Sequence, residues 1–196
     1  MKAVVCTKLG DPNLLEIKEV DKPIISKDEV LIKVEVAGVN FPDALLVQGK
    51  YQIVIDPPFI PGNEVCGIVE EIGENVDIPV GTKVIGIPPI GGFAEFVSLN
   101  KNLVIPVNEG FDPLAGASLP INYGTSYYAL KRRANAQSGE SLLVLGASGG
   151  IGTAAIQLAK VMGLKTICAV GSEDKAKYAK NCLLYTSDAA DDKCSV

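Results

Sequence analysis

The sequence contains no histidine among its 196 residues. This absence excludes Ser-His and Cys-His nucleophiles, HExxH zinc sites and any imidazole general base. Chemistry carried out by this chain therefore has to use other acids, or it has to be supplied by a cofactor.

Paired cysteines, basic clusters and long apolar runs are also absent. The five cysteines are scattered, odd in number and form no CxxC pair, which favours a reducing compartment over a disulfide framework. A net charge of −5, with Lys131, Arg132 and Arg133 as the one basic run, argues against nucleic-acid binding. No apolar run approaches the roughly 20 residues that span a bilayer, and no signal peptide is evident. We therefore expect a cytoplasmic protein without a nucleic-acid or membrane partner.

The first part of the chain, to about residue 110, is rich in β-branched side chains and is interrupted by glycine and proline. Val30, Ile32, Val34 and Val36 alternate with other residues, which predicts a strand over 29–36 with one apolar face. Many short strands separated by turns favour a partly open β-barrel or sandwich. The other strands are predicted at residues 2–7, 14–20, 65–72, 83–86, 93–99 and 102–105.

From about residue 113 the hydrophobic period changes. The sequence predicts helices over 113–119 and 123–136, followed at 141–145 by a continuous apolar run of the kind seen in parallel strands covered on both faces. Apolar residues over 151–162 then share one helical face, and residues 164–170 supply a second strand. Residues 141–170 therefore predict a β-α-β unit.

A glycine-rich motif lies between that strand and that helix. Counted from Ala147, it is the dinucleotide-binding fingerprint with alanine in the place of the first glycine. Gly149 would let the backbone approach a pyrophosphate, Gly152 would let the helix pack closely on the strand, and the helix N–H groups would receive the phosphates. The alternative is a tight strand-to-helix turn without a ligand. The predicted nucleotide-binding residues are Ala147, Ser148, Gly149, Gly150, Ile151 and Gly152.

The residues that follow the second strand bear on which dinucleotide binds. Sites that prefer NAD usually place Asp or Glu about 20 residues beyond the glycines, on the ribose 2′-hydroxyl. Here the strand ends at Val170 and Gly171 without a carboxylate, and Ser172 and Lys175 follow. We therefore expect NADPH, with Ser172 and Lys175 at its 2′-phosphate. In a second, compatible interpretation Ser172 caps the next helix and Lys175 is solvated.

Several stretches besides the glycine motif carry a resemblance to one known family, and the agreement extends from Met1 to about Lys180. They are residues 139–152, 37–40 with Asp43, 48–51, 61–64 with Gly67 and Gly73, and 119–120 with 123–125. Together they resemble the zinc-free quinone oxidoreductase/ζ-crystallin family of the medium-chain dehydrogenase/reductase superfamily.

The resemblance implies an α/β fold in two domains. Residues 1–118 would form a GroES-like β-barrel domain that carries the substrate and catalytic groups. Residues 119–181 would form the first part of a Rossmann domain, a doubly wound parallel sheet that binds NADPH. The resemblance also implies a homodimer for the full-length protein.

The activity implied is NADPH-dependent hydride transfer to a quinone or an α,β-unsaturated carbonyl. Zinc would not take part, since Asn63 stands where zinc relatives carry a histidine beside Glu64. By position, Asn40 and Thr125 would lie near the nicotinamide and Tyr51 would border the substrate pocket. Tyr51, Asn40 and water are the candidate donors to the developing enolate, although Tyr51 is equally compatible with a packing role.

Two other functions remain open at this stage. An enoyl-thioester reductase of the same superfamily would share the cofactor and use a different acceptor. A non-catalytic NADPH-binding protein would bind the cofactor without turnover.

The last residues differ in character from the rest. Residues 182–196 match neither the family nor the helical pattern that begins at Glu173, and they resemble the translated end of a sequencing adapter. We expect them to be non-biological, the alternative being a divergent natural C-terminus. As it stands, the β-α-β unit would leave a sheet edge and apolar faces uncovered. The 196-residue chain alone is therefore expected to be poorly stable and inactive.

Overall fold

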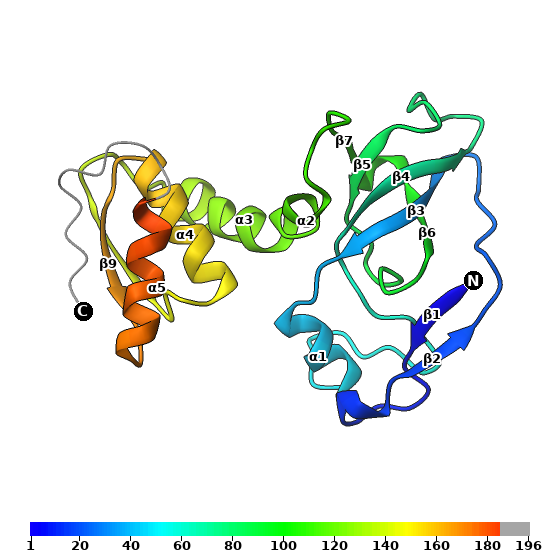
Figure 1. Cartoon of the computed structure of the whole chain (residues 1–196), viewed down its shortest axis with the longest axis horizontal. Coiled ribbons are helices and arrows are strands. Elements are labelled where there is room, and N and C mark those ends of the chain that lie inside the picture. The colour runs from blue at the N-terminus through cyan, green and yellow to red at the C-terminus, as the bar shows by residue number, and fades with distance from the viewer. Residues whose placement is uncertain (185–196) are drawn as a thin grey trace. The chain divides into compact units, whose positions relative to one another are not determined.

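The computed structural model describes residues 1–184, and the expectation for the tail therefore falls largely outside the described residues. The chain divides into two compact units, one formed by Met1–Ser118 and the other beginning at Leu119. Figure 1 labels most of their helices and strands.

The first unit is built on an antiparallel sheet of five strands in the order β6-β3-β4-β5-β7. A separate hairpin of β1 and β2 meets the rest of the unit through isolated bridges, Ala3 to Ala94 and Cys6 to Phe59. The strands are β1 (Lys2–Val5), β2 (Glu16–Glu19), β3 (Glu29–Ala37), β4 (Val65–Ile72), β5 (Lys83–Gly86), β6 (Phe96–Asn100) and β7 (Val104–Pro106). The helical segments are η1 (Pro12–Leu14), α1 (Phe41–Val47), η2 (Lys101–Leu103) and α2 (Pro113–Gly116).

The core of this unit is made mainly of valines from the facing strands. Val30 and Ile32 of β3 are fully buried, as the alternating pattern predicts, and they pack with Val65, Val84 and other apolar residues. The prediction of a single buried face is wrong at the start of β3, where Leu31 is also fully buried. Residues 30–32 are apolar at every position, which is typical of a strand covered on both faces.

The second unit contains the predicted β-α-β arrangement. Strands β8 (Ser141–Leu145) and β9 (Lys165–Ala169) pair in parallel, and α4 (Gly150–Val161) connects them. Helix α3 (Leu119–Tyr127) continues into a π-helix (Tyr128–Arg133), so the helix predicted over 123–136 begins earlier and ends earlier.

The end of the described chain also differs from expectation. Helix α5 (Glu173–Leu184) passes through Cys182, where the sequence pattern predicts a break. The helical backbone continues because cysteine and leucine impose only a small conformational cost in a helix.

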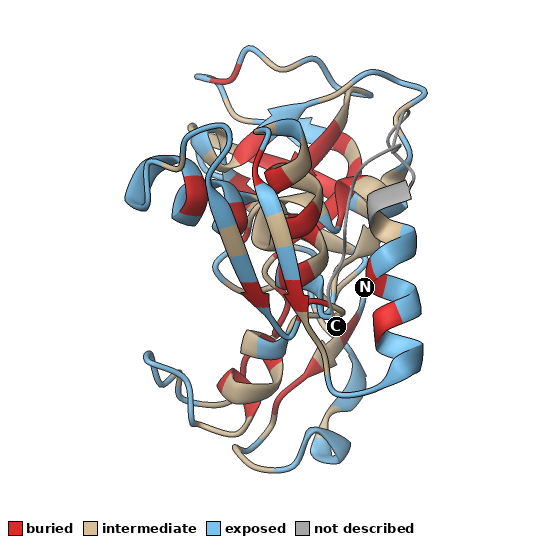
Figure 2. Cartoon of the chain, turned by 90° about the vertical axis from the view of Figure 1, so that its left-hand side faces the viewer, coloured by how far each residue is buried: buried red, intermediate tan, exposed pale blue. Residues whose placement is uncertain are grey.

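One face of the β8–β9 pair is exposed. Leu143, Leu145 and Ile167 lie on that face, and Leu145 is 74 % exposed. Val144 and Cys168 on the opposite face are buried, and along both strands exposed residues alternate with half-buried or buried ones, which Figure 2 draws in pale blue, tan and red. Within residues 1–184, the apolar run of β8 is thus covered on one face, whereas its sequence predicts cover on two.

No helix among the described residues is both long and apolar enough to cross a membrane.

The exposure of one face of β8 can be tested at two adjacent residues of the strand, Leu145 and Val144. Leu145→Thr is expected to lower the fluorescence of a bound hydrophobic dye and to change the free energy of unfolding by no more than about 0.5 kcal/mol. Val144→Thr introduces a hydroxyl on the buried face and should cost roughly 1–3 kcal/mol. Dye titration and urea unfolding measure both effects. Equal destabilisation by the two variants would contradict the orientation of β8.

Candidate functional site

The loop after β3 leads into a short helix that the sequence analysis missed. Helix α1 begins after Asn40, whose extended backbone (φ −120°, ψ 159°) is that of an N-cap residue. The Asn40 backbone N–H donates to Oδ2 of Asp43 at 2.8 Å, and the Asp43 N–H donates to the Asn40 carbonyl at 3.1 Å. Seven residues that include Pro42 are too few for a helical period to be recognised in the sequence.

The side chain of Asn40 reaches the residues just before β4. Its Nδ2 donates to Oε1 of Glu64 at 2.7 Å and to Oδ1 of Asn63 at 3.2 Å. Glu64 is only 1 % exposed. A Cβ atom on Gly38 would lie 2.4 Å from Glu64 Oε1 and 2.2 Å from the Ala117 carbonyl oxygen, so only glycine fits there. These contacts tie the loop after β3 to the start of β4.

Asp43 is a second buried carboxyl group of this region and is 5 % exposed. Burial raises the pKa of Asp43, and the neighbouring Glu64 acts in the same direction. Hydrogen bonds from the backbone N–H groups of Asn40 and Gly62 lower the pKa and offset part of this effect. The net result is a carboxyl group that takes up a proton more readily than an exposed aspartate.

A pocket of about 240 Å³ opens beside α1. Its wall is mostly apolar, and its polar members are Asp43, Asn63 and Tyr51. Tyr51, which the family resemblance places at a substrate pocket, lies in this wall and is 36 % exposed. Asn40 is not in the wall but is hydrogen-bonded to Asn63, which is. The apolar lining residues are Pro42, Leu46, Ile53, Ile55, Pro89 and Ile90.

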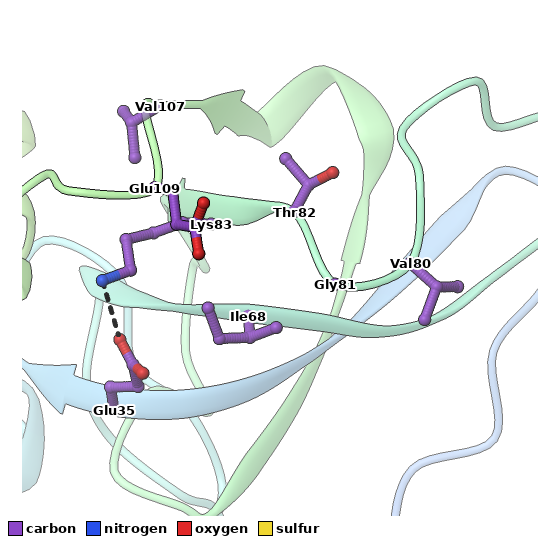
Figure 3. Close-up of a pocket in the computed structure, with 8 residues that line it drawn as sticks. All are labelled: Glu35, Ile68, Val80, Gly81, Thr82, Lys83, Val107 and Glu109. Atoms are coloured by element: carbon purple, nitrogen blue, oxygen red, sulfur yellow. Dashed lines mark ion pairs between the residues drawn. The ribbon is translucent and has the colours of Figure 1, made fainter.

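A second, larger concavity of about 680 Å³ lies over β3, β4 and β5 (Figure 3). Lys83 and Glu35 point toward one another in it and form an ion pair at 3.7 Å. Lys83 Nζ also donates to the carbonyl oxygen of Phe111 at 3.4 Å, so its charge is already engaged. None of the residues predicted from the sequence as functional lines this concavity. The pocket beside α1 is therefore the candidate substrate site of the first unit.

In the second unit, the glycine loop joins β8 to α4. A Cβ atom on Gly152 would lie 2.5 Å from the Gly146 carbonyl oxygen and 2.7 Å from Cα of Ala147, which confirms the predicted packing role of Gly152. Gly149 is the N-cap of α4 and is exposed. The next N–H groups, those of Gly150 and Ile151, lie in the first helical turn, where no intrahelical partner exists. A phosphate fits such a helix start because the N–H groups and the helix dipole both favour an anion.

Ser172 and Lys175 lie at the start of α5, beyond the end of β9. The Lys175 backbone N–H donates to Ser172 Oγ at 3.4 Å, and the Ala176 N–H donates to the Ser172 carbonyl at 3.0 Å. Ser172 therefore caps α5, as the second interpretation of the sequence proposes. Both side chains are exposed. A 2′-phosphate role for the two residues stays a prediction that this arrangement permits.

Thr125 is exposed on α3, which packs against α4. The contact includes a hydrogen bond from Ser126 Oγ to the Ile151 carbonyl at 3.1 Å and one from the Tyr123 hydroxyl to Gln157 Oε1. The proximity of Thr125 to a nicotinamide stays a prediction.

Comparison with known proteins agrees with this arrangement. Residues 26–109 match the family described as alcohol dehydrogenase GroES-like domain. Quinone oxidoreductase of Rattus norvegicus is 38 % identical over 180 residues, which cover 90 % of this chain and 55 % of the rat protein. A probable oxidoreductase from Mycobacterium abscessus superposes with a TM-score of 0.88 at 40 % identity, covering 93 % of this chain and 59 % of that one.

The quinone oxidoreductase of Thermus thermophilus, which was solved also in complex with NADPH, gives a TM-score of 0.82 at 39 % identity. The match covers 92 % of this chain and 57 % of that one. These similarities define an oxidoreductase fold in which a GroES-like domain precedes parallel strands of Rossmann type, and they confirm the predicted fold class. Over about nine tenths of its length the chain is therefore similar to quinone oxidoreductases. It spans about half the length of the curated relatives that it matches.

Of the polar cluster beside the pocket, only Asn40 has a role predicted from the sequence. Asn63 and Glu64 served in the sequence analysis only as a family signature and as an argument against zinc. A signal was present, because Glu64 directly precedes a strand whose first residues are all apolar or glycine. A charged residue in such a place requires a buried partner.

The packing of the glycine loop gives one prediction. Gly152→Ala should destabilise the second unit by roughly 2–4 kcal/mol, because the new methyl group would overlap backbone atoms of the loop. Gly124→Ala in α3 is the matched control, since a Cβ there meets nothing within 4 Å. The control should gain up to about 1 kcal/mol in free energy of unfolding. Urea unfolding measures the stability of both variants. Equal free energies of unfolding for Gly152→Ala and Gly124→Ala would contradict the observed packing.

The raised pKa of Asp43 gives a second prediction. A carboxyl group whose pKa is raised by folding holds more protons in the native state, so its contribution to stability falls as the pH rises through that pKa. Asp43→Asn removes this titration. The free energy of unfolding of the variant minus that of the wild type should therefore increase with pH above 3.8, the ordinary value. The measurement is urea unfolding of both proteins over about pH 3.5 to 7. A difference in free energy of unfolding that stays constant over this range would contradict the raised pKa of Asp43.

Proposed function

We propose that the protein, at the full length of its relatives, is an NADPH-dependent oxidoreductase that transfers a hydride to a quinone or an α,β-unsaturated carbonyl without zinc. The observation that carries this proposal is the glycine loop of the second unit, which is packed too closely for any residue but glycine at 152. The family resemblance further supports a homodimeric, cytoplasmic protein.

The cofactor would be held by the second unit. The backbone from Ala147 to Gly152 would receive the pyrophosphate, as the exposed start of α4 permits. Ser172 and Lys175 would bind the 2′-phosphate, because no carboxylate stands at the end of β9 and an ammonium group lies one helical turn further on. Asn40 and Thr125 would lie at the nicotinamide end. NADPH, when bound, supplies the hydride.

The acceptor would bind in the pocket of the first unit. Its apolar wall suits the ring or hydrocarbon part of a neutral quinone or enone, and none of its nine lining residues is Lys or Arg. As the new C–H bond forms at the β-carbon of an enone, the electron pair of its C=C bond moves toward the carbonyl oxygen. Tyr51, in the pocket wall, would donate the proton that completes the reduction.

Both amide hydrogens of Asn40 face acceptors on Glu64 and Asn63. The donor role that the sequence suggests for Asn40 is therefore not favoured by this arrangement. Within the proposal Asn40 positions its neighbours, and Tyr51 remains the proton donor.

The test is turnover by a protein of the relatives' length that carries residues 1–181. It should oxidise NADPH faster with quinones or simple enones than with crotonyl-type thioesters. Tyr51→Phe should lower kcat for an enone by roughly 100-fold, and for a quinone by less. Tyr127→Phe, an exposed tyrosine of α3, is the control. Faster thioester reduction would favour the enoyl-thioester reductase, and an unchanged kcat of Tyr51→Phe across pH would remove its acid role.

A further inference from the structure

Asn63 carries the further inference, which rests on the proposed function and deepens it. Asn63 lines the pocket beside α1 together with Tyr51. Its side-chain oxygen accepts a hydrogen bond from Asn40 Nδ2 at 3.2 Å. Within residues 1–184, the amide nitrogen of Asn63 donates no hydrogen bond to another residue. The pocket wall thus contains an N–H donor that the fold leaves unused.

The orientation of this amide is fixed by a buried carboxylate at the other end of a short chain of hydrogen bonds. An ionised carboxylate can only accept, so the Asn40 atom that lies 2.7 Å from Glu64 Oε1 has to be the nitrogen. The same nitrogen faces Asn63, so the Asn63 atom that meets it has to be the oxygen. The NH2 group of Asn63 is the part that remains for the pocket. Reversing the Asn40 amide would place its oxygen against the oxygens of Glu64 and Asn63, and reversing the Asn63 amide would place its nitrogen against the nitrogen of Asn40.

Packing holds the first member of this chain in place. Glu64 is 1 % exposed, and the position of Gly38 leaves no room for a side chain beside it. The Gly38 N–H donates to the backbone carbonyl of Glu64 at 3.0 Å. A preorganised donor of this kind needs no reorientation when charge develops on a nearby oxygen, and such donors stabilise transition states most effectively.

We propose that Nδ2 of Asn63 donates a hydrogen bond to the carbonyl oxygen of the acceptor, with Asn40 and Glu64 as the positioning residues. The oxygen gains negative charge as the hydride arrives at carbon, and Asn63 stabilises it without giving up its own proton. The final proton comes from Tyr51, as in the proposed function. Asn63 therefore provides, through an N–H group, the polarisation of the carbonyl that a metal ion would supply as a Lewis acid.

The test is infrared spectroscopy of isotope-labelled cyclohexenone bound to the 196-residue chain, without any cofactor. A hydrogen bond lowers the frequency of the carbonyl stretch. Asn63→Asp keeps the shape and removes the donor, so the bound carbonyl should shift to higher frequency and the dissociation constant should rise roughly tenfold. Asn108→Asp, an exposed residue outside the pocket, makes the same chemical change and should have no effect.

Glu64→Gln tests the positioning chain. Glutamine can present either its oxygen or its NH2 group to Asn40, so one orientation is no longer imposed and Asn63 turns its oxygen toward the pocket in a fraction of the molecules. The carbonyl stretch should then shift to higher frequency although residue 64 does not line the pocket. Circular dichroism verifies that each variant is folded. If Glu64→Gln does not fold, the result for Asn63→Asp alone decides whether the proposal holds.

Three results would overturn the proposal: a carbonyl stretch unchanged by Asn63→Asp, a folded Glu64→Gln variant with the wild-type spectrum, or no binding of cyclohexenone. Because NADPH is absent from this experiment, its outcome is separate from the turnover test. NADPH oxidation that is insensitive to Asn63→Asp would refute the role of Asn63 and leave the proposed function standing. A carbonyl stretch that shifts in Asn63→Asp, in a protein that never oxidises NADPH, would support the hydrogen bond from Asn63 and refute the proposed function.

Discussion

The hydrogen bond between the buried carboxylate of Glu64 and the amide of Asn40 is the contact on which the candidate site of the first unit depends. An ionised carboxyl group loses several kcal/mol of hydration on burial unless donors replace the water. Asn40 is such a donor, and it stands at the N-cap of α1. The carboxylate therefore fixes the loop after β3, the start of the helix and the direction in which Asn63 points. Gly38 is required beside it for purely steric reasons.

The second unit depends on a different constraint, which is the close approach of α4 to the glycine loop. Gly152 has no side chain to separate the helix from the Gly146 carbonyl, so the helix start is brought directly to the end of β8. The unpaired N–H groups at that helix start form a place for phosphate. One unit thus carries features suited to a dinucleotide, and the other carries features suited to an uncharged carbonyl compound.

The parts of the fold that the sequence predicts are those with local signals. Strands β4, β5 and β8 have the predicted bounds, and the β-α-β unit follows from an apolar run, a glycine motif and a helical face. Burial of Leu31 and the short helix α1 were missed, because a triple apolar run and seven helical residues give weak periodic signals. The family resemblance places Tyr51 near a pocket, and the structure puts it in a pocket wall.

The polar cluster could not be predicted in this way. Asn40 and Glu64 are 24 residues apart, and only the pairing of β3 with β4 brings them within 2.7 Å. The orientation of the Asn63 amide follows from that contact and from no property of its sequence neighbours. Ser172 is different, because its capping of α5 depends only on neighbouring residues. The sequence predicts this cap and the structure contains it.

The most direct test of the account is a titration of the chain with NADPH and with NADH, since the residues proposed to bind the 2′-phosphate lie within the described chain. The account predicts that NADPH binds about tenfold more tightly or better, as one charge-assisted phosphate contact would produce. Lys175→Glu should abolish that preference, whereas Lys177→Glu, the same charge change on a lysine 3.8 Å from Asp174, should retain it. Equal affinity for the two cofactors, or a preference that survives Lys175→Glu, would contradict the account.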